Sequence, residues 1–437
     1  PRSSRCPILT PTAGTRHLSF AYRDGVLHAE NVPLEEIGRR FGTPCYVYSR
    51  AAIAAAYGEY ARALSGRDAL ICYSVKANPN LAILATLARL GAGFDIVSAG
   101  ELARVLAAGG DPARTLFSGV GKTEPEIEYA LENRIGCINV ESEAELARIE
   151  RIARRLGRRA PIAMRVNPDI DARTHPYIST GLRENKFGVA HHEAERLYKV
   201  AMTLEHLEIV GVGCHIGSLL TETGPFVAAV ERLCLLVDRL EGAGIRLRHI
   251  DMGGGIGIRY KNEAPEQDEA PEPIGAFVAG ALSALGKRPQ KVIFDPGRSI
   301  VGNAGVLLTQ VQYVKPGFLV VDAAMNDLLR PALYGAWHDV KNVRESPVRE
   351  STGAGGVYDV VGPVCESADF LAKGRRLAAA EGDLLAVLSA GAYGMSMSSN
   401  YNSRPRAPEI LVDGGTTHLV RRRESVEELF AHESIPG

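Results

Sequence analysis

The sequence predicts an α/β protein that combines a (β/α)8 TIM-like barrel with a second, mostly antiparallel β-domain. Its 437 residues exceed the ~250 to 300 at which one hydrophobic core usually stops growing, so we expect two domains. Between residues 70 and 298, short apolar runs alternate with longer amphipathic stretches. After about residue 305 the pattern changes to strand-like runs separated by turns. An open, doubly wound sheet is the alternative architecture for the first region.

The opening of the chain has two parts with different patterns. Residues 1–17 show no helix or strand pattern, and we expect them to be disordered or processed. Residues 18–48 contain an Asp-Gly hairpin signal at Asp24 and Gly25. We therefore assign 18–48 to the β-domain, where it adds one or two strands.

The barrel is expected over residues 49–304, because this region contains eight apolar runs. Each run is followed by a helical pattern such as "SAGELARVLAAGG" or "ESEAELARIERIARRLG", which opens with Ser or Glu and ends at glycine. Eight alternating strand and helix units close most economically into a (β/α)8 barrel. The predicted strands are 70–76, 94–98, 115–120, 137–142, 162–167, 211–218, 249–254 and 292–298.

The C-terminal β-domain is expected over residues 305–437. The runs "VLLTQVQYVK", "FLVVDA", "VYDVVGPV", "LLAVLSAG" and "PEILVDG" follow one another with turns and little helix between them. A short helix is predicted at the end of the chain, over 425–433, and an exposed loop over 261–273.

Composition and charge exclude several classes of protein. The chain is 46% hydrophobic and 23% charged, which is ordinary for a globular protein. A net charge of −1 argues against a nucleic-acid or membrane-surface protein, because these usually carry a basic excess. No apolar run approaches the ~18 residues of a membrane span. We expect a cytoplasmic protein, and Arg2, Arg5 and Arg16 leave import into a plastid open.

The seven cysteines are scattered, and no pair has the spacing of metal ligands. We therefore expect reduced thiols and no metal site.

Reactive side chains gather at the predicted strand ends, where barrel enzymes carry their chemistry. The seventh and eighth ends read "DMGGGIGI" and "DPGR", whose backbone N–H groups and arginine can close on an anion. Barrels commonly hold a phosphate after strands 7 and 8, so we predict a phosphorylated ligand; simple chain turns are the alternative. The other ends supply Lys76, Asp95, Ser98, Gly119, Asn139, Glu141, Arg165, Asn167, His215 and Ser218.

Lys76 follows the apolar run of the first barrel strand, in "ALICYSVKANPN". An isolated lysine there would usually extend into solvent. Together with the phosphate cradle and the carboxylate of Asp295, however, it suits pyridoxal 5'-phosphate, which needs a lysine for covalent attachment and an acid beside its ring nitrogen. We expect partial burial to lower the pKa of Lys76 and free its amine. His215 could stack on the cofactor or could be a buried structural histidine.

The chain resembles the diaminopimelate decarboxylase family, within the barrel-type pyridoxal-phosphate decarboxylases that include ornithine and arginine decarboxylases. The resemblance runs from about residue 20 to the C-terminus and implies an alanine-racemase-like fold of type III. It rests on eight motifs in order: "YSVKAN" (73–78), "NPDIDARTHPYISTGLRENKFG" (167–188), "HIGS" (215–218), "DMGGGIGI" (251–258), "DPGRSIVGNAG" (295–305), "MNDLLRPALYGAWH" (325–338), "CESADFLAKGR" (365–375) and "GAYGMSMSSNYNSRPRAPE" (391–409).

The resemblance implies which residues hold the cofactor. Lys76 would form the Schiff base, and His215 would stack on the pyridine ring. Asp295 would pair with the ring nitrogen at a position where the family usually has a glutamate, so its reach is one methylene shorter. The residues of the phosphate region would be Ser218, Gly254, Gly255, Gly297, Arg298 and Tyr393.

The resemblance also implies substrate contacts from Arg298, Arg330, Tyr334, Glu366 and Tyr393. Two arginines and an acid suit a substrate with two carboxylates and two amines, such as meso-2,6-diaminopimelate, whose decarboxylation gives L-lysine.

Cys365 matches the proton donor of the family, delivered across a homodimer interface, although a lone cysteine is more often a small buried hydrophobe. A further departure from the family pattern is Leu219, where many relatives carry a polar residue.

The alternatives to a diaminopimelate decarboxylase are a decarboxylase for ornithine, arginine or carrier-linked glutamate, an amino-acid racemase, and a non-catalytic pyridoxal-phosphate carrier.

Overall fold

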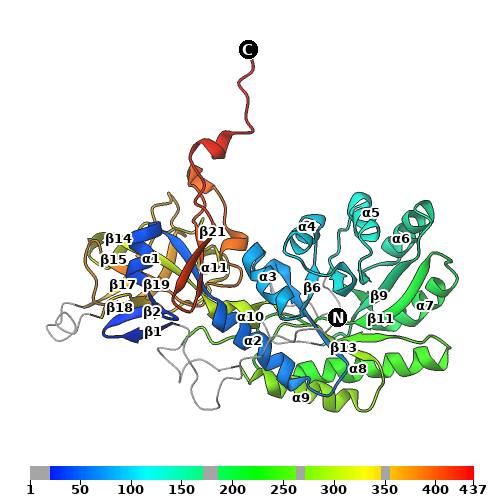
Figure 1. Ribbon diagram of the computed structural model, residues 1–437. Helices are drawn as coiled ribbons and strands as arrows, with labels where there is room; N and C mark the ends of the chain where they lie inside the picture. The colour runs from blue at the N-terminus through cyan, green and yellow to red at the C-terminus, as the bar shows by residue number, and fades with distance from the viewer. Residues whose placement is uncertain (1–19, 171–185, 262–270, 346–354) are drawn as a thin grey trace, which may run out of the picture.

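The computed structural model describes residues 20–170, 186–261, 271–345 and 355–437. Figure 1 shows two bodies side by side, a β-rich domain and a barrel surrounded by helices. The predicted combination of a (β/α)8 barrel and a β-domain is confirmed. The expectations for residues 1–17, and for most of the loop at 261–273, lie outside the described residues.

Eight parallel strands form the closed barrel. Each predicted apolar run supplies one strand, and the ring closes because β13 pairs with β5 and β8 pairs with β9. Closure excludes the open-sheet alternative. A two-residue strand, β10 (Val189–Ala190), extends the sheet beside β9. The barrel strands are β5 (Ala69–Ser74), β6 (Gly93–Ile96), β7 (Thr115–Phe117), β8 (Cys137–Val140), β9 (Ala160–Asn167), β11 (Leu207–Gly213), β12 (His249–Asp251) and β13 (Lys291–Phe294).

Some of the helices that follow these strands begin at a capping side chain. Ser98 and Ser142 accept hydrogen bonds from the backbone N–H groups of Glu101 and Glu145, three residues later. Such caps satisfy donors that a helix start otherwise leaves unpaired. The surrounding helices are α2 (Arg50–Ala63), α3 (Leu81–Arg89), α4 (Ala99–Ala107), α5 (Glu124–Glu132), α6 (Glu143–Arg155), α7 (His191–Met202), α8 (Thr223–Gly242), α9 (Ile274–Leu285) and the short α10 (Arg298–Val301).

The second domain is built around the long strand β14 (Gly305–Lys315). Its sheet has the order β18-β17-β15-β14-β4-β20-β21, with β19 also paired to β14 and β16 paired to β19. The pairs β15–β17 and β4–β20 are parallel and the others are antiparallel, so the sheet is mostly antiparallel, as predicted. The other strands are β4 (Cys45–Ser49), β15 (Phe318–Val321), β16 (Val340–Asn342), β17 (Gly356–Val361), β18 (Phe370–Leu377), β19 (Leu384–Val387), β20 (Glu409–Asp413) and β21 (Thr416–Arg421).

The N-terminal segment forms a small sheet of its own and one strand of the large sheet. Strands β1 (Phe20–Arg23), β2 (Val26–Ala29) and β3 (Val32–Pro33) pair in order, and helix α1 (Leu34–Phe41) follows. The predicted hairpin turn is confirmed, because Asp24 and Gly25 adopt φ values of 50° and 73°. The closing helix predicted over 425–433 is wrong: only a 3-10 turn, Glu427–Phe430, forms there, and no residue in it is buried.

The chain passes between the two bodies at the start of α2 and at the start of β14, beside the predicted boundaries at 48/49 and 304/305. The exact division into domains stays a prediction. The bodies are joined tightly, because the backbone O of Gly391 in the β-domain accepts a hydrogen bond from Asn78 Nδ2 at 3.0 Å. A Cβ atom on Gly391 would lie 1.9 Å from the backbone O of Val301.

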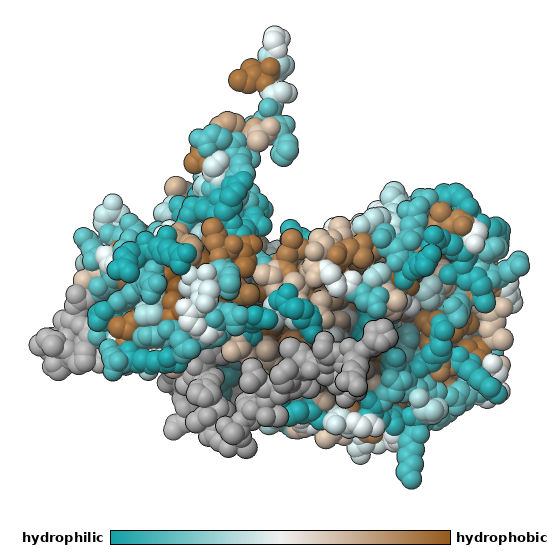
Figure 2. Space-filling model, in the orientation of Figure 1, coloured by the Kyte–Doolittle hydropathy of each residue, from teal (hydrophilic) through white to brown (hydrophobic). Residues whose placement is uncertain are grey.

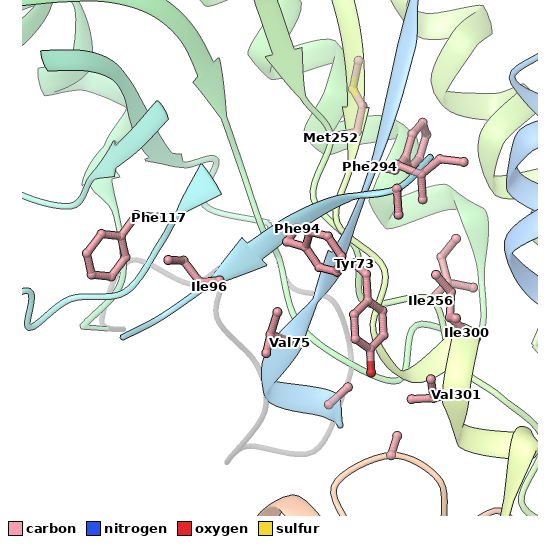
Figure 3. Packing of buried hydrophobic residues seen from close by; sticks show 14 of the residues in the cluster. Tyr73, Val75, Phe94, Ile96, Phe117, Met252, Ile256, Phe294, Ile300 and Val301 are labelled. Carbon is pink, nitrogen blue, oxygen red and sulfur yellow. The ribbon is translucent and has the colours of Figure 1, made fainter. Parts of the chain in front are cut away.

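Large apolar side chains fill the space beneath the carboxyl ends of the barrel strands. Figure 3 shows Tyr73 of β5 beside Phe94 of β6, with Ile300 and Val301 close to its ring. All four are fully or almost fully buried. The hydroxyl of Tyr73 donates to the backbone O of Asn78 at 3.1 Å, which anchors the turn carrying Lys76 to the core. Within the described residues, no helix is both long and apolar enough to cross a membrane.

Replacing Gly391 with alanine should lower the stability of the protein, because the new methyl group must push the two bodies apart. We expect a loss of about 1–3 kcal/mol, typical of overpacking, measured as a lower urea midpoint of unfolding. Gly415 is a suitable control, because a Cβ atom there meets nothing within 4 Å. Equal midpoints for Gly391→Ala and Gly415→Ala would contradict this account of the junction.

Candidate active site

A pocket of about 280 Å³ opens at the carboxyl ends of the barrel strands, where the barrel meets the β-domain. It brings together residues that are far apart in the sequence. Of the predicted site residues, it is lined by Lys76, His215, Ser218, Gly255, Asp295, Gly297, Arg298, Arg330, Tyr334 and Tyr393. The strand-end residues Asp95, Gly119, Asn139 and Arg165 line it as well.

Lys76 lies in the 3-10 turn Val75–Ala77, directly after β5, and its amine faces a buried carboxylate. The Nζ atom is 3.4 Å from Asp95 Oδ2, and the Asp95 side chain is almost fully buried. Ser74 donates to Asp95 Oδ2 at 2.9 Å and Ser118 donates to Asp95 Oδ1. Asn139 donates in turn to Ser118 at 3.0 Å. Four barrel strands thus cooperate in holding one carboxylate beside the lysine.

The electrostatic prediction for Lys76 is wrong in direction. Burial lowers the pKa of Lys76, as predicted, but the attraction of Asp95, followed by Tyr393 and Asp295, outweighs this effect and raises the pKa above that of an ordinary lysine. The sequence indicated the burial but not the facing carboxylate. The contact with Asp95 thus favours the protonated form of Lys76.

Glycines allow the loops that follow β11, β12 and β13 to pack closely against one another. A Cβ atom on Gly255 would lie 2.0 Å from the backbone O of Gly217, and one on Gly254 would lie 2.5 Å from Asp295 Oδ1. Neighbouring Leu219 adopts a φ of 66°, a left-handed conformation that costs a leucine about 1–2 kcal/mol. Asparagine tolerates this backbone conformation better than leucine does.

Asp295 presents an unsatisfied oxygen to the pocket. Its Oδ1 atom is buried and has no hydrogen-bond partner among the described residues. His215 Nδ1 lies 3.6 Å away, but it accepts a hydrogen bond from the N–H of Gly254 at 3.4 Å. A buried carboxylate oxygen without a donor is costly, so this geometry suits a ligand that brings an N–H group. Burial, followed by repulsion from Asp295, raises the pKa of Asp251 well above its ordinary value.

Two arginines give the far wall of the pocket its positive charge. Arg298 and Arg330 are both buried, with 7% and 3% of their surface exposed. Arg298 donates from Nε and Nη2 to Ser218 Oγ, at 3.3 and 3.1 Å. Within the described residues neither guanidinium forms an ion pair with a carboxylate. Buried cations without counter-charges favour the binding of an anionic ligand.

Tyr393 connects the β-domain to the turn that carries Lys76. Its backbone N–H donates to the backbone O of Ala77 at 2.8 Å, and its φ of 55° is unusual for a residue other than glycine. Its ring packs against Arg298, whose Cζ atom is 4.7 Å from the ring centroid. Strained backbone of this kind is found at ligand sites, where surrounding contacts hold it in place.

The structure does not bring every predicted site residue into this pocket. Gly254 lies behind the lining, against Asp295. Cys365 and Glu366 are exposed on the β-domain and do not line the pocket of their own chain. Asn402 Oδ1 accepts from the N–H of Cys365 at 3.2 Å, and Tyr401 donates to Glu366. Within the described residues, no group of three or more His, Cys, Asp or Glu side chains could hold a metal.

Sequence reasoning missed several residues that complete the site. Ser74 and Ser118 share the signal used for Lys76, because each lies at the end of a barrel strand. Tyr260 and His338 gave no such signal, since they lie in loops and are recognised only by their contacts with Arg298 and Arg330.

The chain is similar to known proteins over nearly its whole length. Residues 50–302 match the family described as pyridoxal-dependent decarboxylase, pyridoxal binding domain. The chain is 59% identical to a diaminopimelate decarboxylase of Pseudomonas aeruginosa, across 95% of this chain and 99% of the relative. A relative of the same name from Vibrio cholerae is 52% identical, across 95% and 99%.

Solved structures show the same architecture. The structure of a diaminopimelate decarboxylase from Helicobacter pylori complexed with L-lysine is 45% identical, with a TM-score of 0.87 over 92% of this chain and 99% of the other. A diaminopimelate decarboxylase structure from M. jannaschii is 35% identical, with a TM-score of 0.89 over 96% and 98%.

Replacing Asp95 with asparagine should lower the pKa of Lys76, because burial then acts without the opposing carboxylate. In the wild-type protein the raised pKa of Lys76 adds to the stability of the fold. This contribution is fully present at pH values below the ordinary lysine pKa and is lost as the pH rises through the raised pKa. We expect the Asp95→Asn protein to react with an amine-specific reagent at Lys76 at lower pH, as followed by peptide mass spectrometry. Asp238→Asn, on the outer helix α8, serves as the control. An unchanged pH dependence at Lys76 would contradict the assignment.

Proposed function

The chain belongs to the diaminopimelate decarboxylases, within the family of pyridoxal-dependent decarboxylases, and we propose that it converts meso-2,6-diaminopimelate to L-lysine and carbon dioxide. The observation that carries the proposal is one pocket lined both by the amine of Lys76 and by two buried arginines, Arg298 and Arg330, which have no carboxylate partner in the described part of the chain. A substrate with two carboxylates and two amines complements this lining.

Pyridoxal 5'-phosphate fits the pocket on three observations. The amine of Lys76 can attach an aldehyde, and Asp295 Oδ1, which has no donor among the described residues, can accept from a ring N–H. Gly255 and Gly297 line the pocket without side chains, which leaves backbone exposed to a phosphate. When bound, this cofactor supplies the electron sink that a decarboxylation needs. We propose that Ser218, Gly254, Gly297, Arg298 and Tyr393 complete the phosphate region, and that His215 packs against the ring.

Lys76 and Asp95 are proposed to exchange one proton between them. The amine must lose its proton before it can react as a nucleophile. Asp95 Oδ2, 3.4 Å from Nζ, is the acceptor in position to take it. The hydrogen bonds from Ser74 and Ser118 keep Asp95 oriented while the proton moves. The attraction of Asp95 also raises the pKa of Lys76, so before the reaction the proton is proposed to lie on Nζ.

Arg298, Arg330, Tyr334 and Tyr393 are proposed to bind the substrate. The guanidinium groups can meet carboxylates with two parallel hydrogen bonds each, which fixes the orientation of the substrate. The hydroxyl groups of the two tyrosines add donors at the same wall of the pocket. Because the arginines line the same pocket as Lys76, a substrate held by them can present its amine to Lys76.

Cys365 and Glu366 are proposed to act in the pocket of a second copy of the chain. Both are exposed, and the contacts to Asn402 and Tyr401 hold their loop in a fixed shape. Apolar side chains are exposed just after the first barrel strands, at Leu81, Val97 and Val120, and Val97 also lines the pocket. Figure 2 shows apolar surface gathered between the two domains, beside a largely polar remainder. A homodimer would cover such surface and place Cys365 as proton donor.

The cytoplasmic location of the protein stays a prediction from the sequence.

The identity of the substrate is tested by measuring the release of the products. Purified protein with added pyridoxal phosphate should release carbon dioxide and form L-lysine from meso-diaminopimelate, and do so faster than from ornithine or arginine at equal concentration. Lys76→Ala should abolish both this activity and the visible absorption of the attached cofactor, because no other amine replaces it. Lys199→Ala, on the outer face of α7, is the matched control. Faster turnover of ornithine would overturn the substrate assignment, and a fully active Lys76→Ala protein would overturn the mechanism.

Replacing Cys365 with alanine should slow the release of L-lysine by about 100-fold or more, because proton donors commonly contribute that much. The absorption of the attached cofactor should remain, since Cys365 lies outside the pocket of its own chain. Mixing inactive Cys365→Ala with inactive Lys76→Ala protein tests the shared site. A mixed dimer contains one complete pocket, so activity should return on mixing. No recovery in a mixture shown to exchange subunits would exclude a donor from the partner.

A further inference from the structure

Arg330 is held in the wall of the pocket by two neutral partners. Its Nη1 atom lies 2.7 Å from His338 Nε2, and its Cζ atom lies 4.6 Å from the centroid of the Tyr260 ring. Arg330 begins the short helix α11 (Arg330–Tyr334) and His338 follows that helix, so the pair closes the loop that also carries Tyr334. All three contact groups are buried, with His338 completely inaccessible.

The hydrogen bonds of His338 fix its proton on one nitrogen. Its Nδ1 atom lies 2.8 Å from the backbone O of Leu388, and a carbonyl oxygen can only accept, so Nδ1 carries the hydrogen. In the neutral ring Nε2 is then an acceptor, which suits an N–H of Arg330. Burial, followed by the charge of Arg330, lowers the pKa of His338 to about 3, so the ring stays neutral at physiological pH.

Tyr260 contacts both arginines at once. While its ring packs against Arg330, its hydroxyl accepts a hydrogen bond from Arg298 Nη1 at 2.6 Å. The rings of Tyr260 and His338 meet edge to face, with centroids 5.2 Å apart. The two guanidinium groups repel each other, and Tyr260 offers each of them a favourable contact without neutralising either. A carboxylate in place of Tyr260 or His338 would cancel the charge that a ligand needs.

We propose that His338 and Tyr260 are positioning residues that fix Arg330 and Arg298 through neutral contacts, so that both positive charges remain available to the carboxylates of the substrate. This inference rests on the proposed function, because it assigns the two arginines to substrate carboxylates. The residues act through the arginines, and they are expected to govern substrate affinity more than the chemical step.

Two amide substitutions at His338 separate the contact with Arg330 from the rest of the site. Asparagine can still donate to Leu388 from the position of Nδ1 but is too short to reach Arg330. Glutamine places an acceptor near the position of Nε2 and keeps the contact. We expect His338→Asn to raise KM for meso-diaminopimelate about tenfold or more with a smaller change in kcat, and His338→Gln to keep KM within about threefold of wild type.

Tyr260→Phe provides a second test if an amide variant does not fold. It keeps the ring beneath Arg330 and removes the acceptor for Arg298, so KM should rise several-fold while the cofactor absorption is retained. Equal KM values for His338→Asn and His338→Gln, or an unchanged KM in Tyr260→Phe, would overturn the inference. A wild-type protein that releases no carbon dioxide from meso-diaminopimelate would instead overturn the proposed function, so the two failures are distinguishable.

Discussion

The contact between the amine of Lys76 and the buried carboxylate of Asp95 is the interaction on which the rest of the site depends. A buried carboxylate is stable only when it is paired and hydrogen-bonded. The parallel pairing of β5 and β6 sets Ser74 opposite Asp95, and β7 brings Ser118 to the other carboxylate oxygen. The register of the barrel strands therefore fixes the position of Asp95, and with it the contact that Lys76 makes. The same contact raises the pKa of Lys76, and we propose that Asp95 receives the proton when the amine reacts.

The pocket is complete only because two domains meet at its mouth. The barrel supplies Lys76, Asp295 and Arg298, while the β-domain supplies Arg330, Tyr334 and Tyr393. The close packing of Gly391 against Val301 and the hydrogen bond from Tyr393 to Ala77 hold the two halves in register. The pocket is lined by buried carboxylates beside Lys76 and by the buried guanidinium groups of Arg298 and Arg330. An amino acid with a carboxylate at each end can place its carboxylates on the arginines, which is the physical basis of the proposed substrate.

The sequence was sufficient for the barrel, because each strand lies within a short apolar run and the longer stretches between the runs carry helical patterns, some of which open at a capping side chain such as Ser98 or Ser142. Reading the strand ends also located Lys76, His215, Asp295 and Arg298. The closing helix failed because its apolar residues, such as Val426 and Phe430, have no surface to pack against. The pKa of Lys76 was predicted in the wrong direction because burial is visible in a sequence but the facing carboxylate is not. Tyr260 and His338 could not be found, since their roles follow from contacts between loops.

The most direct test of the central claim is to identify the amine that joins the cofactor. The purified protein is incubated with pyridoxal phosphate, reduced with borohydride so that the linkage becomes permanent, and digested for peptide mass spectrometry. The account predicts stoichiometric modification of Lys76, with the other lysines near background. Modification of a different lysine, with Lys76 left unlabelled, would contradict it.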